Sequence, residues 1–208
     1  EFFLNPTSMY CRNLMSMDVE EMIRGLPIDA VVLLSGCDKT TPAMLMGALS
    51  SDIPSILLTS GPQLKGNWRG ESLGSCTDCR RYWSELRAGN ITQDQYDSLE
   101  SAIYRSKGHC MVMGTASTMA CISEVLGIML PGGATIPAAD SRRLVLAEET
   151  GRISVEMVSK GTKPSNILTK AAFTNAIKVL LAMGGSTNAV IHLIAIAGRL
   201  GIKLELDT

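Results

Sequence analysis

The sequence has 208 residues, of which 46% are hydrophobic and 19% are charged, and its formal net charge is −1. These values predict a globular chain rather than a disordered one, and they allow one sizeable domain. Lys and Arg never cluster beyond a pair, which argues against a nucleic-acid or anionic-membrane partner. No apolar stretch reaches the roughly 20 residues that a transmembrane helix needs.

The chain contains six cysteines. A chain of this length can build a sufficient core without disulfides, so we expect reduced thiols in a cytoplasmic protein, with metal or cluster ligation open. The sequence begins without Met, and residues 203–206 near its end indicate the beginning of another strand or a linker. We therefore expect it to be a piece of a longer protein. The cysteines are Cys11, Cys37, Cys76, Cys79, Cys110 and Cys121.

The first predicted elements form a strand–helix–strand unit. A helical pattern over residues 19–24 precedes a short apolar strand at 30–34, a helix at about 42–49 and a second strand at 55–59. This order is typical of a βαβ unit, and short continuous apolar runs suit strands that are buried on both faces. We therefore predict an α/β fold with a mostly parallel sheet flanked by helices.

Helices dominate the rest of the chain. Residues 63–75 are polar and rich in glycine, and we expect a long loop of the kind that is often functional. The pattern and its capping residues then predict helices at about 77–88, 93–107 with Thr92 as N-cap, 115–126, 138–159, 170–183 and 189–200.

The loop after the first predicted strand concentrates reactive side chains. Cys37, Asp38 and Lys39 follow Ser35-Gly36 directly and precede a predicted helix. In an open α/β sheet, ligands bind where the carboxyl ends of strands meet the starts of helices. A buried core thiol beside a solvated polar turn would produce the same pattern, so both readings stay open.

A second turn resembles the first. Cys110 follows His109 and lies shortly before another predicted helix. A helix N-terminus favours an anion and lowers the pKa of a thiol, so both cysteines suit a thiolate ligand. Two such turns can converge at one end of a sheet, and His109 can reach the same pocket. Sulfur sites, however, usually need three or four ligands.

Asp38 and Lys39 raise a question of charge. The Asp38 carboxylate suits a hard cation such as Mg²⁺, which a protonated Lys39 would repel. Lys39 therefore pairs with Asp38, pairs with a substrate carboxylate, or is modified. Carbamylation by carbon dioxide would convert its amine into an anionic oxygen ligand.

Three further features stay open. Cys76 and Cys79 form a CxxC motif, which indicates either half a metal or redox site or two ordinary helix cysteines. His192 lies in an apolar helical stretch, where a satisfied core histidine is more common than a ligand. The Gly-Gly-Ser-Thr-Asn break at 184–188 either contacts an anion through its backbone or only lets two helices pack closely.

Four motifs, in order and spacing, resemble the dihydroxy-acid dehydratase and phosphogluconate dehydratase family. Thr40-Thr41-Pro42-Ala43, the Met-Gly-Thr-Ala-Ser run and the Gly-rich loop are similar to the sugar-acid branch, which includes arabinonate and xylonate dehydratases. The branch of branched-chain amino-acid synthesis is the alternative. The motifs are GCDKTTPAMLMGA, GHCMVMGTASTMACISEVLG, PGGATIPAADSRR and AFTNAIKVLLAMGGSTNAVIHLIAIAG.

The resemblance implies that residues 1–208 are part of an N-terminal iron–sulfur dehydratase α/β domain, without the family's C-terminal β-barrel domain. It implies a hydro-lyase that converts a small 2,3-dihydroxy acid into a 2-keto acid. The implied cofactors are a [2Fe–2S] cluster, with [4Fe–4S] as the alternative, and Mg²⁺. It also implies that the intact protein is a dimer or tetramer and that this piece alone is inactive.

The resemblance also assigns residues. Cys37 and Cys110 match two of the three cluster cysteines, whereas Cys11 lies too close to Cys37 to be the third. Asp38 matches a magnesium ligand, and Lys39 matches the carbamylated lysine that also binds magnesium. The implied catalytic residues are Lys39 and His109. The alternative from another class is a non-catalytic metal-binding or redox module that uses the CxxC motif.

Overall fold

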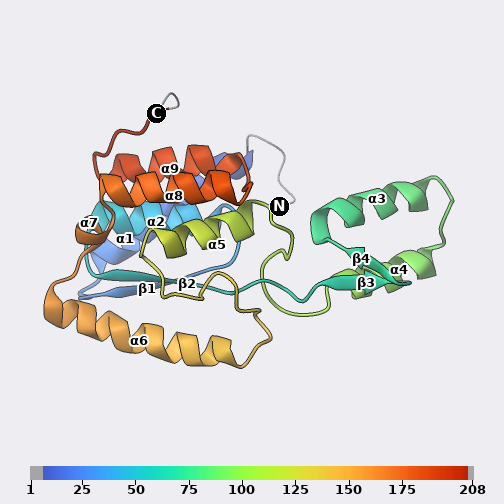
Figure 1. The fold of residues 1–208 in the computed structure, drawn as a ribbon, viewed down its shortest axis with the longest axis horizontal. Helices are drawn as coiled ribbons and strands as arrows, with labels where there is room; N and C mark the ends of the chain where they lie inside the picture. The colour runs from blue at the N-terminus through green and yellow to red at the C-terminus, as the bar shows by residue number, and fades with distance from the viewer. Residues whose placement is uncertain (1–6, 206–208) are drawn as a thin grey trace.

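The structure is a computed structural model that describes residues 7–205, except for the side chains of Thr7 and Cys76. Figure 1 shows a main body that contains the parallel strands and most helices, with a smaller part extending to one side. The elements in chain order are α1 (Thr7–Gly25), β1 (Val31–Ser35), α2 (Thr40–Ser51), β2 (Ser55–Thr59), β3 (Gly66–Trp68), β4 (Glu71–Leu73), α3 (Ser75–Arg87), α4 (Gln93–Ile103), α5 (Thr115–Val125), α6 (Arg142–Lys160), α7 (Pro164–Ile167), α8 (Lys170–Ala182) and α9 (Asn188–Arg199).

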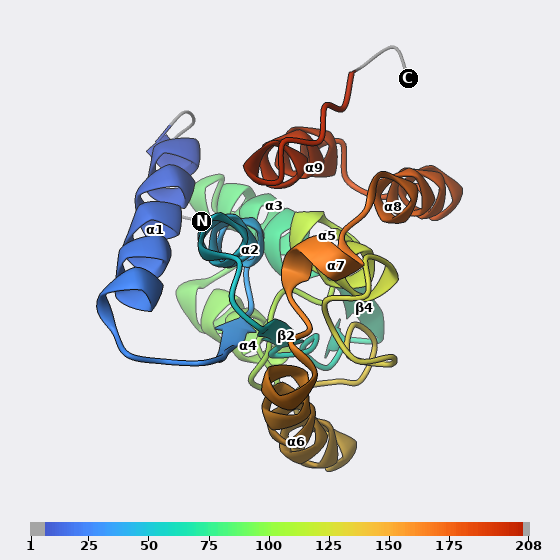
Figure 2. The same ribbon diagram turned by 90° about the vertical axis from the view of Figure 1, so that its left-hand side faces the viewer.

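A two-stranded parallel sheet lies at the centre of the main body. β1 and β2 run side by side with Val31 opposite Ser55, and α2 forms the crossover between them. Figures 1 and 2 show α6 on one face of the sheet and α2, α5, α8 and α9 toward the other. All five positions of β2 are buried, as expected for a strand covered on both faces. The predicted α/β fold with parallel strands is therefore confirmed.

The main hydrophobic core fills the space between the sheet and the helices above it. Its residues are mostly aliphatic or methionine, in keeping with the low aromatic content of the chain. Burial of each such side chain contributes about 1.5–3 kcal/mol relative to leaving it in water. The largest fully buried members include Leu45, Leu57, Met119, Phe173 and Leu193.

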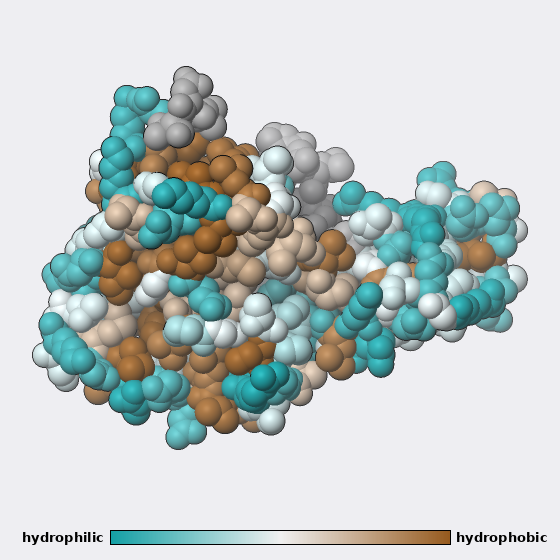
Figure 3. Space-filling view, viewed as in Figure 1, coloured by the Kyte–Doolittle hydropathy of each residue, from teal (hydrophilic) through white to brown (hydrophobic). Residues whose placement is uncertain are grey.

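Residues 66–103 form an extension that we call the arm. It consists of β3, β4, α3 and α4, projects away from the main body in Figure 1, and presents a mostly hydrophilic surface on the face drawn in Figure 3. The arm has a small core of its own, separate from the main core, made by Leu73, Tyr96, Leu99 and Ile103.

The arm corrects the prediction of a long loop over residues 63–75. β3 and β4 instead form an antiparallel hairpin in which Trp68 pairs with Glu71. The two residues between them, Arg69 and Gly70, have φ values of 52° and 85°. Positive φ at both positions is the type I′ hairpin turn that matches strand twist. The sequence does not reveal it because Arg at the first turn position is an uncommon choice.

Most predicted helices are confirmed with shifted ends. The Thr92 capping box is present, since Thr92 Oγ1 accepts from Gln95 N, but α4 stops at Ile103 rather than 107. α1 begins far earlier than predicted because its buried face includes the polar residues Arg12 and Ser16, which hide the periodicity. α6 begins at Arg142 rather than 138, and α7 was not predicted.

Of the two alternatives for residues 203–206, a strand or a linker, the strand is not seen in the described part. Residues 203–205 belong to no strand, and residue 206 lies outside the described residues. Within residues 7–205, no helix combines the length and apolar character that crossing a membrane requires.

Leu99→Ala is expected to destabilise the arm by about 2 kcal/mol, because it leaves a cavity in a core of few residues. Hydrogen exchange should show lower protection of the α4 amides, with β2 amides unchanged. Leu181→Ala is the matched control. Leu181 is 75% exposed on α8, so its truncation should change the protection of neither the α4 nor the β2 amides. Equal loss of protection in β2 would show instead that the arm and the main body unfold as one unit.

Candidate active site

The Cys37 loop lies at the carboxyl end of β1, as the sequence predicts. The backbone N–H of Cys37 donates to Thr40 Oγ1 at 2.9 Å, which ties the loop to the first turn of α2. A Cβ on Gly36 would lie 2.7 Å from Ser60 Oγ, so the loop passes close to the residue that follows β2, and a larger residue would require the Ser60 side chain to move. A hydrogen bond to the Thr40 hydroxyl and close packing against Ser60 therefore hold the loop in place.

Asp38 and Lys39 form an ion pair at this loop. Lys39 Nζ donates to Asp38 Oδ2 at 2.5 Å, and Cys37 Sγ lies 3.4 Å from Asp38 Oδ1. Asp38 is only 5% exposed. In the described form Lys39 thus follows the first of its predicted alternatives, pairing with its neighbour, while its carbamylation stays a prediction.

The Cys110 turn is held by the arm and by α5. Cys110 Sγ lies 2.7 Å from Oγ of Ser75, the first residue of α3. The carbonyl of Cys110 accepts from Ser117 Oγ at 3.2 Å and from His109 Nδ1 at 2.9 Å. Ser75 is nearly fully buried, so its hydroxyl is fixed beside the thiol.

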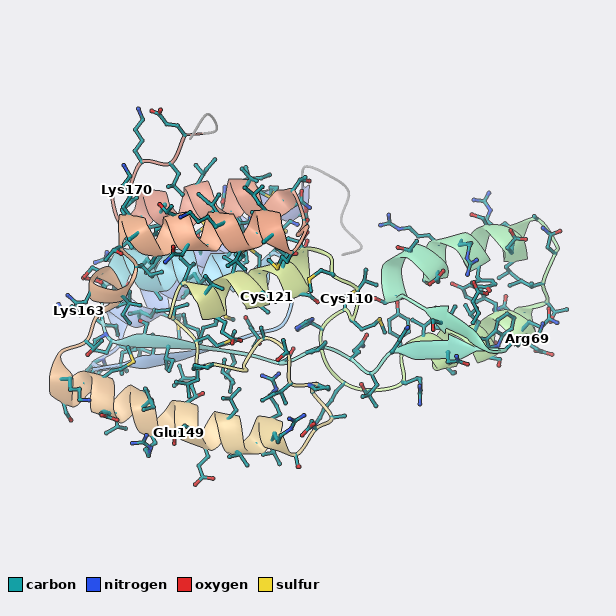
Figure 4. The ribbon with its side chains drawn as sticks, in the orientation of Figure 1. Arg69, Cys110, Cys121, Glu149, Lys163 and Lys170 are labelled. Atoms are coloured by element: carbon teal, nitrogen blue, oxygen red, sulfur yellow. The ribbon has the colours of Figure 1, made fainter. Side chains whose placement is uncertain are left out.

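Cys37, Asp38 and Cys110 line the same open cavity, whose volume is about 610 Å³. In Figure 4, Cys110 lies where the main body meets the arm, whereas Cys121 lies within α5. The two loops that the sequence singles out are therefore brought together. The rest of the wall combines apolar surface, which includes Val112 and Ala116, with polar side chains that come from Gln63, Ser75, Thr77, Arg80, Tyr104 and Asn188.

His109 lies behind Cys110 and is not among the residues that line the cavity. Its backbone N–H donates to Gly61 O, and its carbonyl accepts from Gln63 N, both at 2.9 Å. A carbonyl can only accept, so the ring donates through Nδ1 to Cys110 O. Burial, and then the charge of Arg143, lower the pKa of His109 and favour the neutral ring. The described contacts of His109 therefore shape the Cys110 turn.

The donor set fits part of a metal centre. Two half-buried thiols from separate loops and a buried carboxylate open on one cavity, which suits an iron–sulfur cluster beside a hard cation. Among residues 7–205, however, no group of three or more His, Cys, Asp and Glu side chains is placed to hold a metal ion. Further ligands would have to come from outside the described residues.

The break at 184–188 allows two helices to pack closely, the second of its two predicted roles, while contact of its backbone with an anion stays a prediction. A Cβ on Gly185 would lie 2.9 Å from Thr118 Cγ2, so this glycine allows the close packing of the turn. The turn also delivers Asn188 to the cavity wall, where its Nδ2 donates to Thr115 Oγ1 at 3.2 Å.

Cys79 also lines the cavity, from the side of the arm. Its Sγ lies 3.5 Å from the Tyr96 hydroxyl, and this contact, with burial, raises the pKa of Tyr96 to about 12. The side chain of Cys76 lies outside the described residues, so a functional CxxC pair stays a prediction.

His192 is a core histidine, but only one of its two ring nitrogens has a hydrogen-bond partner in the described part of the chain. Its side chain is fully buried, and Nδ1 lies 3.1 Å from a guanidinium nitrogen of Arg12. Its other ring nitrogen, Nε2, has no hydrogen-bond partner among the residues that the structure describes. Burial, and then the charge of Arg12, lower the pKa of His192 to about 4, so the ring is neutral at pH 7.

Sequence reasoning missed the cavity residues that come from the arm. Ser75, Thr77 and Arg80 lie at the start of a predicted helix after the Gly-rich segment, and their types alone do not point to a site. A helix start after a glycine-rich segment was the one available signal. The direction in which the arm turns back toward Cys110 is not encoded in any local pattern.

Comparison with known proteins identifies relatives along the whole chain. L-arabonate dehydratase of Azospirillum brasilense is 57% identical over 204 residues, which are 98% of this chain and 35% of the relative. 6-Deoxy-6-sulfo-D-gluconate dehydratase of Pseudomonas putida is 49% identical over 207 residues, which are 100% of this chain and 36% of the relative. Dihydroxy-acid dehydratase of Halothermothrix orenii is 42% identical over 200 residues, which are 96% of this chain and 36% of the relative.

The chain thus spans about a third of the length of the curated relatives that it matches. Residues 3–208 match the family described as dihydroxy-acid/6-phosphogluconate dehydratase N-terminal. This match covers the Cys37 loop, the arm, the Cys110 turn and α9, so the whole cavity lies within it. The chain belongs to the dihydroxy-acid/6-phosphogluconate dehydratase family and corresponds to its N-terminal part.

Proposed function

We propose that the complete protein is a hydro-lyase that dehydrates a sugar acid, an aldonate such as arabinonate or xylonate, to a 2-keto-3-deoxy acid. The observation that carries the proposal is the convergence of Cys37, Asp38 and Cys110 on one cavity. Relatives named as L-arabinonate and D-xylonate dehydratases, at 56% and 45% identity, support the substrate class. The complete protein is further proposed to act in the cytoplasm as a dimer or tetramer.

Cys37 and Cys110 would contribute two thiolates to a [2Fe–2S] cluster, with [4Fe–4S] as the alternative, and Asp38 with Lys39 would hold Mg²⁺. When bound, these groups would supply Lewis-acid stabilisation of the leaving hydroxyl and of the charge that develops on the substrate. Within this chain, the Ser75 hydroxyl can donate to the Cys110 thiolate from 2.7 Å and so hold its orientation and charge.

Polar side chains on the cavity wall support a polyhydroxylated substrate. Gln63, Thr77 and Asn188 can exchange hydrogen bonds with substrate hydroxyls, and Arg80 brings a positive charge that attracts a carboxylate. A branched alkyl tail would leave these polar groups without partners, which costs binding free energy. The alternative, dihydroxy-acid dehydratase of branched-chain amino-acid synthesis, is supported by relatives of that name at 42–45% identity.

Keto-acid formation tests the proposal. The complete protein, reconstituted anaerobically with iron and sulfide and supplied with Mg²⁺, is expected to dehydrate aldonates with a kcat/KM about 100-fold above that for a branched-chain 2,3-dihydroxy acid. The reverse preference would establish the amino-acid-pathway alternative. If neither substrate reacts and metal binding requires Cys76 and Cys79, the non-catalytic metal-binding or redox module is correct instead.

A further inference from the structure

The buried Arg12–His192 pair carries an inference about Lys39. An arginine guanidinium can only donate hydrogen bonds, so His192 Nδ1, at 3.1 Å from Arg12, must accept. The proton of the neutral ring therefore lies on Nε2. This N–H is fully buried and has no acceptor in the described structure, a rare and costly arrangement. An acceptor placed beside Nε2 would therefore lower the free energy of this site.

The position of His192 on α9 brings its ring close to the elements that form the candidate site. Asn188, the first residue of α9, lines the cavity, and His192 lies four residues later on the same helix face. Helix side chains tilt toward the N-terminus of their helix, so the ring extends back toward Asn188. α9 also packs against α2, which begins directly after Lys39. The ring is fully buried and is not among the residues that line the cavity, so it lies behind the wall, in the region where α9 packs against α2.

The electrostatics place the same residues together. After burial and Arg12, the charge of Lys39 lowers the pKa of His192 further, and the charge of Asp38 opposes it. Lys39 and Asp38 therefore face the ring closely enough to influence it.

Arg12 makes this region favourable to an anion. It is only 7% exposed, and its described hydrogen-bond partners, Asn13 Oδ1 and His192 Nδ1, are both neutral acceptors. Burial, and then the charge of Arg199, lower the pKa of Arg12. A buried cation without an anionic hydrogen-bond partner stabilises a negative charge placed nearby.

We propose that His192 is a positioning residue whose Nε2–H donates to a carbamate formed on Lys39, an inference that rests on the proposed metal-binding role of Lys39. In carbamylation, the lone pair of the neutral Nζ attacks the carbon of CO₂, a C–N bond forms, and one C=O π pair moves onto oxygen. The nitrogen proton leaves to solvent. An oxygen of the carbamate accepts the hydrogen bond that Nε2–H donates. The negative charge of the carbamate is stabilised by the positive charge of the Arg12 guanidinium.

Carbamylation can be measured directly with ¹³C-labelled bicarbonate and ¹³C NMR on the complete, metal-free protein. A Lys39→Met blank identifies the signal that belongs to this residue. His192→Leu is expected to need roughly tenfold more bicarbonate for half-maximal signal, because it removes a hydrogen bond to a charged group. His192→Gln should retain the signal, since its amide can accept from Arg12 and donate from nearly the position of Nε2.

Two further variants separate positioning from folding. Ile196→Ala removes a fully buried side chain one turn further along the same face of α9, and should lower stability without changing the carbamate signal. His192→Asn keeps a polar group but is too short to reach the Nε2 position, so it should behave like His192→Leu.

Each outcome has a clear meaning. If the wild type shows no signal that the Lys39→Met blank removes, both this inference and the proposed role of Lys39 are wrong. If the wild type carries the carbamate and His192→Leu or His192→Asn carries it equally at the same bicarbonate concentration, only the inference about His192 is wrong, and the proposed dehydratase is unaffected.

Discussion

Replacing either Cys37 or Cys110 with alanine is expected to remove the iron–sulfur cluster from the complete protein and to lower dehydratase kcat/KM by at least about 10³-fold. Loss of even an outer-shell partner of a metal ligand commonly costs 10- to 100-fold, and each thiol is proposed to be a ligand itself. Iron content, acid-labile sulfide and the visible spectrum after anaerobic reconstitution measure the cluster, and keto-acid formation measures activity.

Cys121→Ala is the matched control for this experiment. Its thiol packs against the main core from α5 and does not line the cavity, so the variant should keep iron and activity. The assignment of Cys37 and Cys110 would be wrong if both variants kept their iron while a Cys76/Cys79 double alanine variant lost it.

Arg143→Met is expected to lower the free energy of unfolding by about 3 kcal/mol, or the melting temperature by roughly 10 °C. Arg143 is only 8% exposed, and its guanidinium donates to three backbone carbonyls, those of Thr59, Gly133 and Ile136. Relief from burying a cation offsets part of this loss. Thr59 ends β2, so these bonds join the strand to the segment that precedes α6.

The effect of Arg143→Met should extend to the candidate site. Gly61, whose carbonyl accepts from His109 N, packs directly against the Arg143 guanidinium. Loss of that support should loosen the turn that carries Cys110. The neighbouring Arg142→Met is the matched control, because Arg142 is exposed and its ion-pair partner within the described part of the chain is Asp140 at the surface. The melting temperature of this variant should match that of the wild type. Equal melting temperatures for Arg143→Met and Arg142→Met would show that the buried Arg143 contributes little to the stability of the fold.

The sequence by itself determined the parts of the fold that local pattern encodes. The apolar runs that became β1 and β2, and the helix between them, were predicted within one or two residues at most ends. A continuous apolar run between glycine and proline breaks is sufficient to specify a buried strand. The Cys37 loop and the Cys110 turn were recognised for the same reason, since each is a short polar turn before a helix start.

Tertiary structure alone decided how these pieces meet. Ser75 reaches Cys110 across 35 residues, and Arg12 reaches His192 across 180 residues, contacts that no local periodicity records. The Arg69-Gly70 hairpin depends on strand pairing, and the orientation of His109 toward its own neighbour's carbonyl depends on the loops packed around it. Local pattern reports which face of an element is buried, but not which element covers it. That choice follows from packing the whole core, which is a property of the folded chain.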